Sequence, residues 1–435
     1  MTGIVLAKVD ERRSRFGTLG LVLLSEKVIQ VCQEIATFTE TDGLTSRPLF
    51  AESMRSCHRV LRSWMEKLGM RVSVDAVGNL RGLYSGESVS GERLLIGSHL
   101  DTVPNAGPYD GVLGVALAIA VIEALEGQRF NYEIEVIGFS EESGQRFGAA
   151  FLGSRALVGR VDEALLETRD TAETTLREAI SQYGLDAANL PDALITSETF
   201  AFLEFHIERG PVLESLHKPL GVVEAIVGRS RFTVEFIGEP SNSGTTPMNL
   251  RRDALSGAAE WIGMVEQEAR SVNGLFATVE KVEVFPGATG VIPSNVTMSI
   301  DMRHHSDKTL NGTIARLLEK ARHVAQRRRL RFDAHRTLDH QAVTMHPGLV
   351  HVAERALRLA GCPSSRLVSG YGHDAMIVAE KIPSALIFIR TPDGLSQHPG
   401  MQVSPADLDL AIQSGLYFLK EITGFSRKTT VSAYA

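Results

Sequence analysis

The chain has 435 residues, of which 43% are hydrophobic and 22% charged, and its formal net charge is −7 with a pI near 6.0. A chain of this length exceeds one ordinary hydrophobic core, so we expect a globular protein of two domains. The negative balance argues against a nucleic-acid partner, which would need a basic face, and leaves a small-molecule substrate open.

The N-terminal part of the chain carries no targeting signal that we recognise. The apolar run at 19–24 follows three arginines, but it is too short for a secretory signal peptide and no small-residue cleavage site follows it. No segment is long enough to span a bilayer. Three widely spaced cysteines without a C-x-x-C pair fit a reducing compartment: Cys32, Cys57 and Cys362. We therefore expect a cytoplasmic protein with no membrane partner.

The first part of the chain alternates between helical and strand patterns. Apolar spacing predicts a helix over 48–70, and Gly69 before Arg71–Val74 suggests a helix stop followed by a strand. Residues 93–98 read as a buried strand, 112–125 as a buried helix and 133–140 as a strand that enters a core. This order predicts an α/β sandwich with parallel pairing.

A different pattern begins near Gly221. Residues 232–238 alternate as a half-exposed antiparallel strand does. A helix at 251–268, strands at 279–284 and 297–302, and a helix at 308–327 complete a β-α-β-β-α pattern, which suits an open sheet with two helices on one face. After 336 the chain returns to a helix, a strand at 384–389 and a helix from 405. We expect a lid at 219–335, inserted into a discontinuous catalytic domain at 1–218 and 336–435.

Polar residues that suit catalysis follow the predicted strands. Each has an ordinary explanation when taken alone: a solvated loop for His99 and Asp101, a helix cap for Asp110, and a polar turn for the pair Glu141-Glu142. His206 is also more often structural than a ligand. Their conjunction at strand ends and a helix start instead predicts a metal site, because Zn²⁺ favours mixed histidine and carboxylate ligands.

Several longer motifs resemble the hydantoinase/carbamoylase branch of the aminoacylase-type metallohydrolases. They are G-S-H-L-D-T-V-P-N (97–105), Y-D-G-V-L-G-V (109–115), R-F-G-A-A-F-L-G-S-R-A-L (146–157), H-I-E-R-G-P-V-L-E (206–214), G-T-T-P-M-N-L-R-R-D-A (244–254), S-G-Y-G-H-D-A-M (369–376) and G-L-S-Q-H-P (394–399). The match covers nearly the whole chain in order. The resemblance implies an α/β catalytic domain with a mixed sheet, of the zinc-peptidase type. It also implies an inserted α+β lid, an open four-stranded sheet with two helices, that forms a homodimer.

The resemblance assigns roles to matching positions. One metal would be held by His99, the bridging Asp110 and His206. Asp101 would orient His99, and Glu142 would be the general base that takes a proton from the attacking water. Substrate contacts would come from His373 and from Arg303, whose planar guanidinium suits a carboxylate.

The departures from the family pattern fall on the second metal of the usual pair. Its carboxylate ligand in E-E-G-x-R-F is Ser143 here, and its histidine in G-I-S-H-x-P is Gln397, with His398 one position later. A hydroxyl and an amide are poor substitutes around zinc, so we expect one divalent metal per chain. Zinc is favoured, with manganese, cobalt or nickel as alternatives. His398 could restore the second site only through a one-residue shift of its loop.

Three further positions differ where the family binds substrate. The lid histidine is Asn242, the asparagine of N-V-I-P is Gly290, and the glutamine of H-I-E-Q-G is Arg209. The new guanidinium and the lost amide predict a ligand other than an ordinary carbamoyl amino acid. The resemblance implies an amidohydrolase of linear amide or ureido C–N bonds in carboxylate-bearing small molecules. Two alternatives stay open: a binding protein that lost turnover, and altered chemistry such as acyl transfer on the same scaffold.

Overall fold

The computed structural model describes residues 18–87, 91–394 and 398–425. The chain forms two compact units. Unit 1 comprises residues 1–224, 345–367 and 373–435, and unit 2 comprises 225–344 and 368–372. Within the described ranges no helix is long and apolar enough to cross a membrane. The polar site candidates at 99–110, 141–143 and 206–209 all belong to unit 1.

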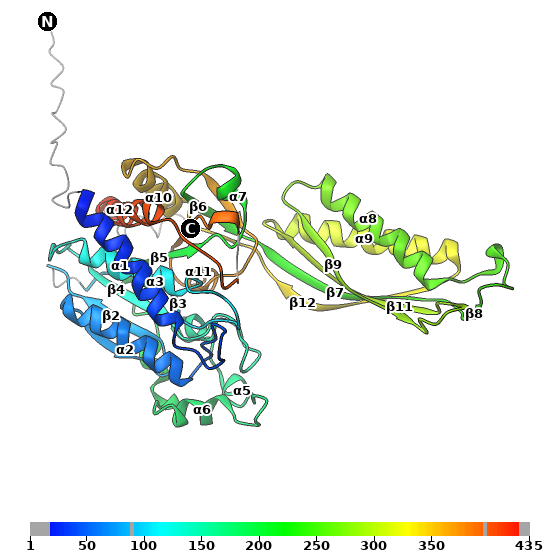
Figure 1. Ribbon diagram of the computed structural model, residues 1–435, viewed down its shortest axis with the longest axis horizontal. Helices are drawn as coiled ribbons and strands as arrows, with labels where there is room; N and C mark the ends of the chain where they lie inside the picture. The colour runs from blue at the N-terminus through cyan, green and yellow to red at the C-terminus, as the bar shows by residue number, and fades with distance from the viewer. Residues whose placement is uncertain (1–17, 88–90, 395–397, 426–435) are drawn as a thin grey trace, which may run out of the picture. The chain divides into compact units, whose positions relative to one another are not determined.

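The nine-stranded sheet, most of whose residues belong to unit 1, is mixed, with its parallel strands at the centre (Figure 1). Its order is β1-β2-β4-β3-β5-β15-β6-β13, and β14 also pairs with β6. Strands β4, β3, β5 and β15 run parallel to one another. The strands are β1 (Arg71–Val74), β2 (Leu80–Tyr84), β3 (Arg93–His99), β4 (Glu133–Phe139), β5 (Thr199–Ile207), β6 (Leu220–Ile226), β13 (Val343–Thr344), β14 (Arg366–Ser369) and β15 (Ser384–Ile389).

A fully apolar helix anchors this sheet. Helix α3 (Val112–Glu123) is buried along nearly its whole length and packs on β3, β4 and β5, while α1 and α12 pack on α3. A helix that is hydrophobic all round needs such cover on every side. The other helices are α1 (Thr18–Ala36), α2 (Glu52–Lys67), α4 (Leu152–Leu157), α5 (Glu163–Leu166), α6 (Leu176–Gln182), α7 (Val212–Ser215), α10 (Pro347–Leu359), α11 (Asp374–Val378) and α12 (Pro405–Glu421).

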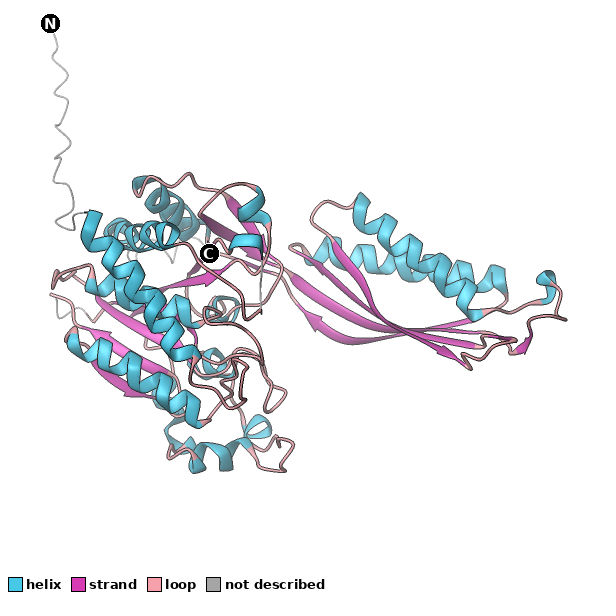
Figure 2. Ribbon diagram, viewed as in Figure 1, coloured by secondary structure: helices cyan, strands magenta, loops and turns pink. Residues whose placement is uncertain are grey.

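Unit 2 contains a four-stranded antiparallel sheet with both of its long helices on one face (Figure 2). The order is β12-β7-β11-β9, and every second residue of β7 is buried, as a one-sided sheet requires. Trp261 and Phe236 lie in the core between sheet and helices. The elements are β7 (Gly228–Ile237), β8 (Ser241–Asn242), α8 (Ala254–Ser271), β9 (Phe276–Phe285), β10 (Val291–Ile292), β11 (Asn295–His304), α9 (Asp307–Arg328) and β12 (Arg331–His340).

The predicted fold class is confirmed, a mixed-sheet α/β part and a separate small antiparallel sheet with two helices. Two local predictions differ from the structure. The helix expected at 48–70 begins only at Glu52, because Phe50 has φ +61° and so stands outside a helix. The helix expected directly after 336 is preceded by β12, which crosses the expected boundary at 335. As an edge strand β12 is mostly exposed, so it lacks the alternation that reveals a strand.

Candidate metal centre

Three neighbouring parallel strands bring the predicted residues to one edge of the sheet. His99 ends β3, Glu142 comes just after β4, and His206 lies at the end of β5. Parallel strands present their carboxyl ends on the same side, which is where α/β folds bind ligands. Asp110 joins them from the turn before α3. All four side chains are buried or nearly so.

Gly111 explains how Asp110 comes so close to His99. Its φ of +72° is one that L side chains rarely adopt, and a Cβ at this position would lie 2.4 Å from the His99 ring. Helix α3 can therefore start directly beside the imidazole. This places the Asp110 carboxylate at the end of the strands.

The side chains of His99, Asp110 and His206 form a set that fits one divalent cation. Their ligand atoms all lie within 4.8 Å of one another. The two Nε2 atoms are 3.1 Å apart, and Asp110 Oδ1 lies 4.0 Å from His99 Nε2 and 3.6 Å from His206 Nε2. Ligands bonded to zinc at about 2.0–2.1 Å lie at comparable separations from one another.

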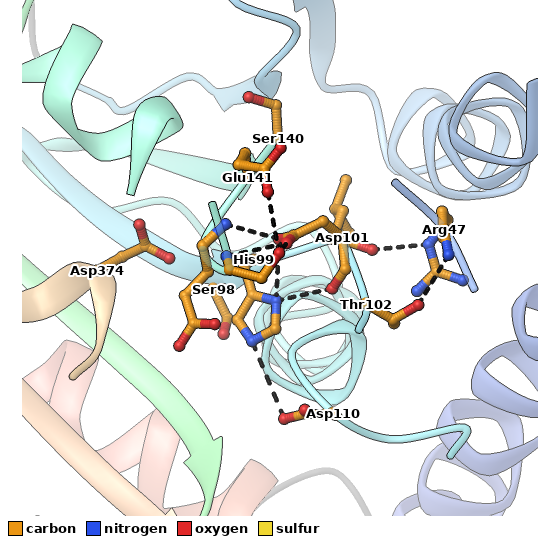
Figure 3. Close-up of polar contacts among 12 residues, drawn as sticks. Arg47, Ser98, His99, Asp101, Thr102, Asp110, Ser140, Glu141 and Asp374 are labelled. Carbon is orange, nitrogen blue, oxygen red and sulfur yellow. Dashed lines mark hydrogen bonds and ion pairs between the residues drawn. The ribbon is translucent and has the colours of Figure 1, made fainter. Parts of the chain in front are cut away.

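The other ring nitrogens hold both imidazoles in the orientation that a metal needs. His99 Nδ1 donates to the carbonyl of Asp101 at 2.9 Å, and His206 Nδ1 donates to the carbonyl of Ile207 at 2.8 Å. Ligand histidines usually make such a bond, because it fixes the tautomer and directs Nε2 at the metal. Figure 3 shows His99 between Asp101 and Asp110.

Neighbouring charges shift the pKa values of the two imidazoles in opposite directions. Burial opposes the charged form of both rings. For His99 the nearby carboxylates, with Glu142 foremost, outweigh it and raise the pKa to about 10. For His206 burial and then Arg209 lower the pKa to about 3. Without a metal the charged form of His99 and the neutral form of His206 are therefore favoured, and metal binding would release a proton from His99.

Asp101 lies behind His99 and ties together the two loops that carry site residues. Its Oδ1 is 3.3 Å from His99 Nδ1 and accepts from the backbone of Glu142 at 2.8 Å. The loop is supported from outside by buried Arg47, which donates to the carbonyl of Leu100 and whose backbone pairs with Thr102 (Figure 3). Asp101 thus lies against His99, and its role in orienting a metal ligand stays a prediction.

Ser143, predicted as a degenerate ligand position, has its hydroxyl bonded to two acids. Its hydroxyl lies 2.7 Å from Asp101 Oδ2 and 2.9 Å from Glu141 Oε1. Burial, followed by the charge of Asp101, raises the pKa of Glu141 to about 8. The hydroxyl has become part of a hydrogen-bonded turn after β4.

The Arg209 guanidinium, predicted to contact the substrate, lies inside the site and bonds its carboxylates. Both Nε and Nη2 contact Asp110 Oδ1, at 2.8 and 2.6 Å, and Nη1 lies 3.3 Å from Glu142 Oε1. Burial opposes it, but Arg209 and the two histidines hold the pKa of Asp110 below its usual range. The neighbouring Glu208 turns the other way and caps α7 through the backbone nitrogens of Val212 and Leu213.

A second buried layer lies behind His206. Glu204, His206 and His373 offer ligand atoms within 4.8 Å of one another, and the rings of His206 and His373 meet edge to face. Burial raises the pKa of Glu204 to about 7, and burial and Glu204 raise the pKa of Asp374 well above its usual value. Sequence reasoning missed both acids. The available signal was a single charged residue, Glu204, within an otherwise apolar strand.

The remaining predicted positions lie elsewhere. His398 is exposed and its Nδ1 accepts from the backbone of Gly400 at 3.0 Å, while Gln397 lies outside the described residues. In unit 2, Arg303 bonds Asp301 and the carbonyl of Gly370. The Asn242 side chain accepts from the backbone of a tight turn, 244–245. Gly290 has φ +81°, a conformation that asparagine also tolerates.

An α/β unit with this ligand set at its strand ends, joined to a small four-stranded lid unit, defines the class of two-domain metal-dependent hydrolases. Residues 95–421 match the peptidase family M20/M25/M40, and the chain belongs to that family. The family is metal-dependent, and the cation set described above fits that property.

Relatives and solved structures place the chain further. It is 35% identical to an N-carbamoyl-L-amino acid amidohydrolase of Geobacillus stearothermophilus, over 83% of this chain and 89% of that protein. It is 30% identical to allantoate deiminase 2 of Glycine max, over 97% and 94%. A hydantoinase/carbamoylase family amidase from Burkholderia multivorans superposes with a TM-score of 0.85 at 28% identity, covering 91% and 97%. The predicted resemblance, and with it an amidohydrolase type of enzyme, is confirmed.

Proposed function

We propose that the protein hydrolyses a linear amide or ureido C–N bond in an N-carbamoyl or N-acyl amino acid, with one divalent metal per chain. The observation that carries the proposal is the convergence of His99, Asp110 and His206 on one point at the strand ends. The names of the relatives support this substrate class. Three protein ligands with an open position are the usual form of a catalytic zinc site.

The chain's own residues divide the remaining work. A divalent cation, when bound, supplies Lewis-acid activation of water and of the scissile carbonyl. Glu142 lies at the next strand end, near Asp110 and Arg209, and is the proposed base that accepts the proton of the attacking water and passes it to the leaving nitrogen. Asp101 is a positioning residue, because it supports His99 and fixes the backbone of Glu142.

Zinc is the proposed metal because two imidazoles and one carboxylate suit it better than they suit magnesium or calcium. One ion is proposed rather than two, since Ser143 makes its hydrogen bonds with Asp101 and Glu141. The substrate is proposed to carry a carboxylate for Arg303, and the chain to work as a homodimer in the cytoplasm. The three buried free cysteines support a reducing compartment.

One observation favours a second candidate, a binding protein that has lost turnover. Arg209 bridges Asp110 and the proposed base Glu142. In such a protein Arg209 would stay bonded to Asp110 and Glu142 when a ligand binds. Ligands would then stabilise the fold without being converted.

Metal analysis of the purified protein, joined to a screen of N-carbamoyl and N-acyl amino acids for release of ammonia or amine, separates the two. The proposal expects about one divalent ion per chain and turnover that a chelator abolishes and added zinc restores. Ligand-induced stabilisation without turnover, in protein shown to hold its metal, would establish the binding protein instead.

A further inference from the structure

Arg209 is a buried arginine whose contacts the proposed reaction does not use. Its side chain is 4% exposed, and its backbone has φ +56°, which is uncommon for a residue other than glycine. Gly210 and Pro211 follow directly in the sequence. This turn directs the guanidinium back toward the strand ends rather than outward.

The guanidinium bonds the same atoms that a metal would need. Nη2 lies 2.6 Å from Asp110 Oδ1 and 3.2 Å from His99 Nε2, and these two atoms are 4.0 Å apart. A cation bonded to both at about 2 Å must lie close to the line that joins them. The three distances place Nη2 only about 2 Å from the middle of that line.

Two positive groups cannot share this space. A guanidinium nitrogen has no lone pair to offer a metal, and at about 2 Å it would lie at bonding distance from an ion of the same sign. The contact with Asp110 Oδ1 is doubled, through Nε and Nη2, and Nη1 reaches Glu142 as well. A metal therefore cannot lie between Asp110 and His99 while the Arg209 guanidinium occupies this position.

We propose that Arg209 is a tethered cation that competes with the metal for Asp110 and His99, so that metal binding requires its guanidinium to leave. Arg209 thereby sets the metal affinity of the site. When its guanidinium is in place, it forms ion pairs with both Asp110 and Glu142. The inference rests on the proposed metal site and adds a regulator to it. It assigns Arg209 a role toward the metal, where the sequence predicted a role toward the substrate.

The test is a calorimetric titration of Zn²⁺ into chelator-treated protein, comparing wild type with Arg209→Gln and Arg209→Lys. Glutamine removes the charge, so Arg209→Gln is expected to bind zinc at least tenfold more tightly. Lysine keeps the charge but cannot bond Asp110 through two nitrogens, so Arg209→Lys should fall between the two. Without zinc Arg209→Gln should melt below wild type, and saturating zinc should close or reverse that difference.

Arg81→Gln is the matched control. Arg81 is also an arginine of unit 1 with a nearly buried side chain, and it bonds Glu135 away from the ligand set. This variant should lose stability without a change in zinc affinity. If it gains affinity as Arg209→Gln does, the effect is general loosening and the inference fails.

The outcomes separate this inference from the proposed function. Equal zinc affinity in wild type and Arg209→Gln, or weaker binding in the variant, overturns the competition but leaves the metal site standing. Failure of both folded proteins to bind Zn²⁺, Mn²⁺ or Co²⁺ overturns the metal site itself. Zinc binding by Arg209→Gln and Arg209→Lys that exceeds wild type in the stated order supports the inference.

Discussion

Both units of this protein contain a cluster of arginines and carboxylates, but the ratio of arginines to carboxylates differs between them. At the strand ends of unit 1 one guanidinium, Arg209, serves two carboxylates, Asp110 and Glu142. In unit 2 the buried Asp301 receives Arg229 and Arg231 on one oxygen and Arg303 on the other. In the first cluster the carboxylates outnumber the guanidinium, and in the second the guanidiniums outnumber the carboxylates.

The difference teaches which ligand each region suits. In unit 1 the two histidines add ligand atoms beside the Asp110 carboxylate, so that cluster suits a cation. The three guanidiniums of unit 2 outnumber their two acids, Asp301 and Glu280, which pairs with Arg231. Guanidinium forks suit carboxylates. Although burial opposes it, Arg303 and Arg229 hold the pKa of Asp301 below its usual range, so the acid stays charged and orders them. The predictions below test this division.

The largest effect is expected at the proposed base. Glu142→Gln keeps the shape of the side chain and removes its capacity to take a proton. We expect kcat/KM to fall by about 10²- to 10⁴-fold, the usual contribution of a general base, with the zinc content unchanged because Glu142 is not in the three-ligand set. The measurement is steady-state amine or ammonia release beside metal analysis. Activity within a factor of ten of wild type would remove Glu142 from the mechanism.

A smaller effect is expected in unit 2. Arg303→Gln should lower kcat/KM by about 10- to 100-fold, mainly through KM, because a charge-assisted hydrogen bond to a substrate carboxylate is worth roughly 1.5–3 kcal/mol. Arg252→Gln is its control, since Arg252 makes an exposed ion pair with Glu239 in the same unit. If Arg303→Gln and wild type have equal kinetics, Arg303 does not bind the substrate carboxylate.

The sequence predicted the strands that carry the unit 1 cluster well. Apolar runs at 93–98, 133–140 and 384–389 agree with β3, β4 and β15 to within about a residue, and α12 begins at Pro405 as expected. Because parallel strands end at one edge, the residues after them could be brought together without coordinates. His99 and His206 lie at such strand ends, whereas Asp110 comes from the turn before α3. The choice of these three residues as one ligand set came from the family resemblance and stays a prediction.

The balancing charges could not be predicted in the same way. The place of Arg209 depends on one left-handed backbone angle that swings its side chain back over the strand end, and no periodicity encodes that. The burial of Asp374 beside Glu204 joins segments far apart in the chain. The strand β12 is an exposed edge with little alternation, so its polar residues resembled a linker.

A third buried imidazole, that of His58, shows how burial and charged neighbours each affect the pKa of a histidine. His58 in α2 is also buried, but its charged neighbours are arginines, so burial and then Arg62, Arg47 and Arg55 lower its pKa to about 3. The unfolded state binds its proton near pH 6.5, so stability is present above that pH and is lost as the pH falls below it.

For His58 we expect a cost of about 2 kcal/mol at pH 5, from the difference between the two pKa values. His58→Gln cannot take up the proton, so its unfolding free energy should fall less than that of wild type between pH 7 and pH 5. Urea titrations at both pH values measure the difference. Parallel pH dependence in the two proteins would show that His58 is not the group responsible.

The smallest effect is expected at Ser143, the position that separates one metal from two. Its hydroxyl has a single proton, shared between Asp101 Oδ2 and Glu141 Oε1, while its backbone nitrogen bonds Asp101 independently at 3.1 Å. Ser143→Ala should therefore cost about 1 kcal/mol of stability, the worth of one hydrogen bond, and change zinc affinity less than twofold. Urea unfolding and zinc titration of the same preparation measure both. A tenfold loss of zinc affinity with little loss of stability would make Ser143 a ligand. The site would then hold two metals, and the contrast between the two clusters would have to be redrawn around a second cation.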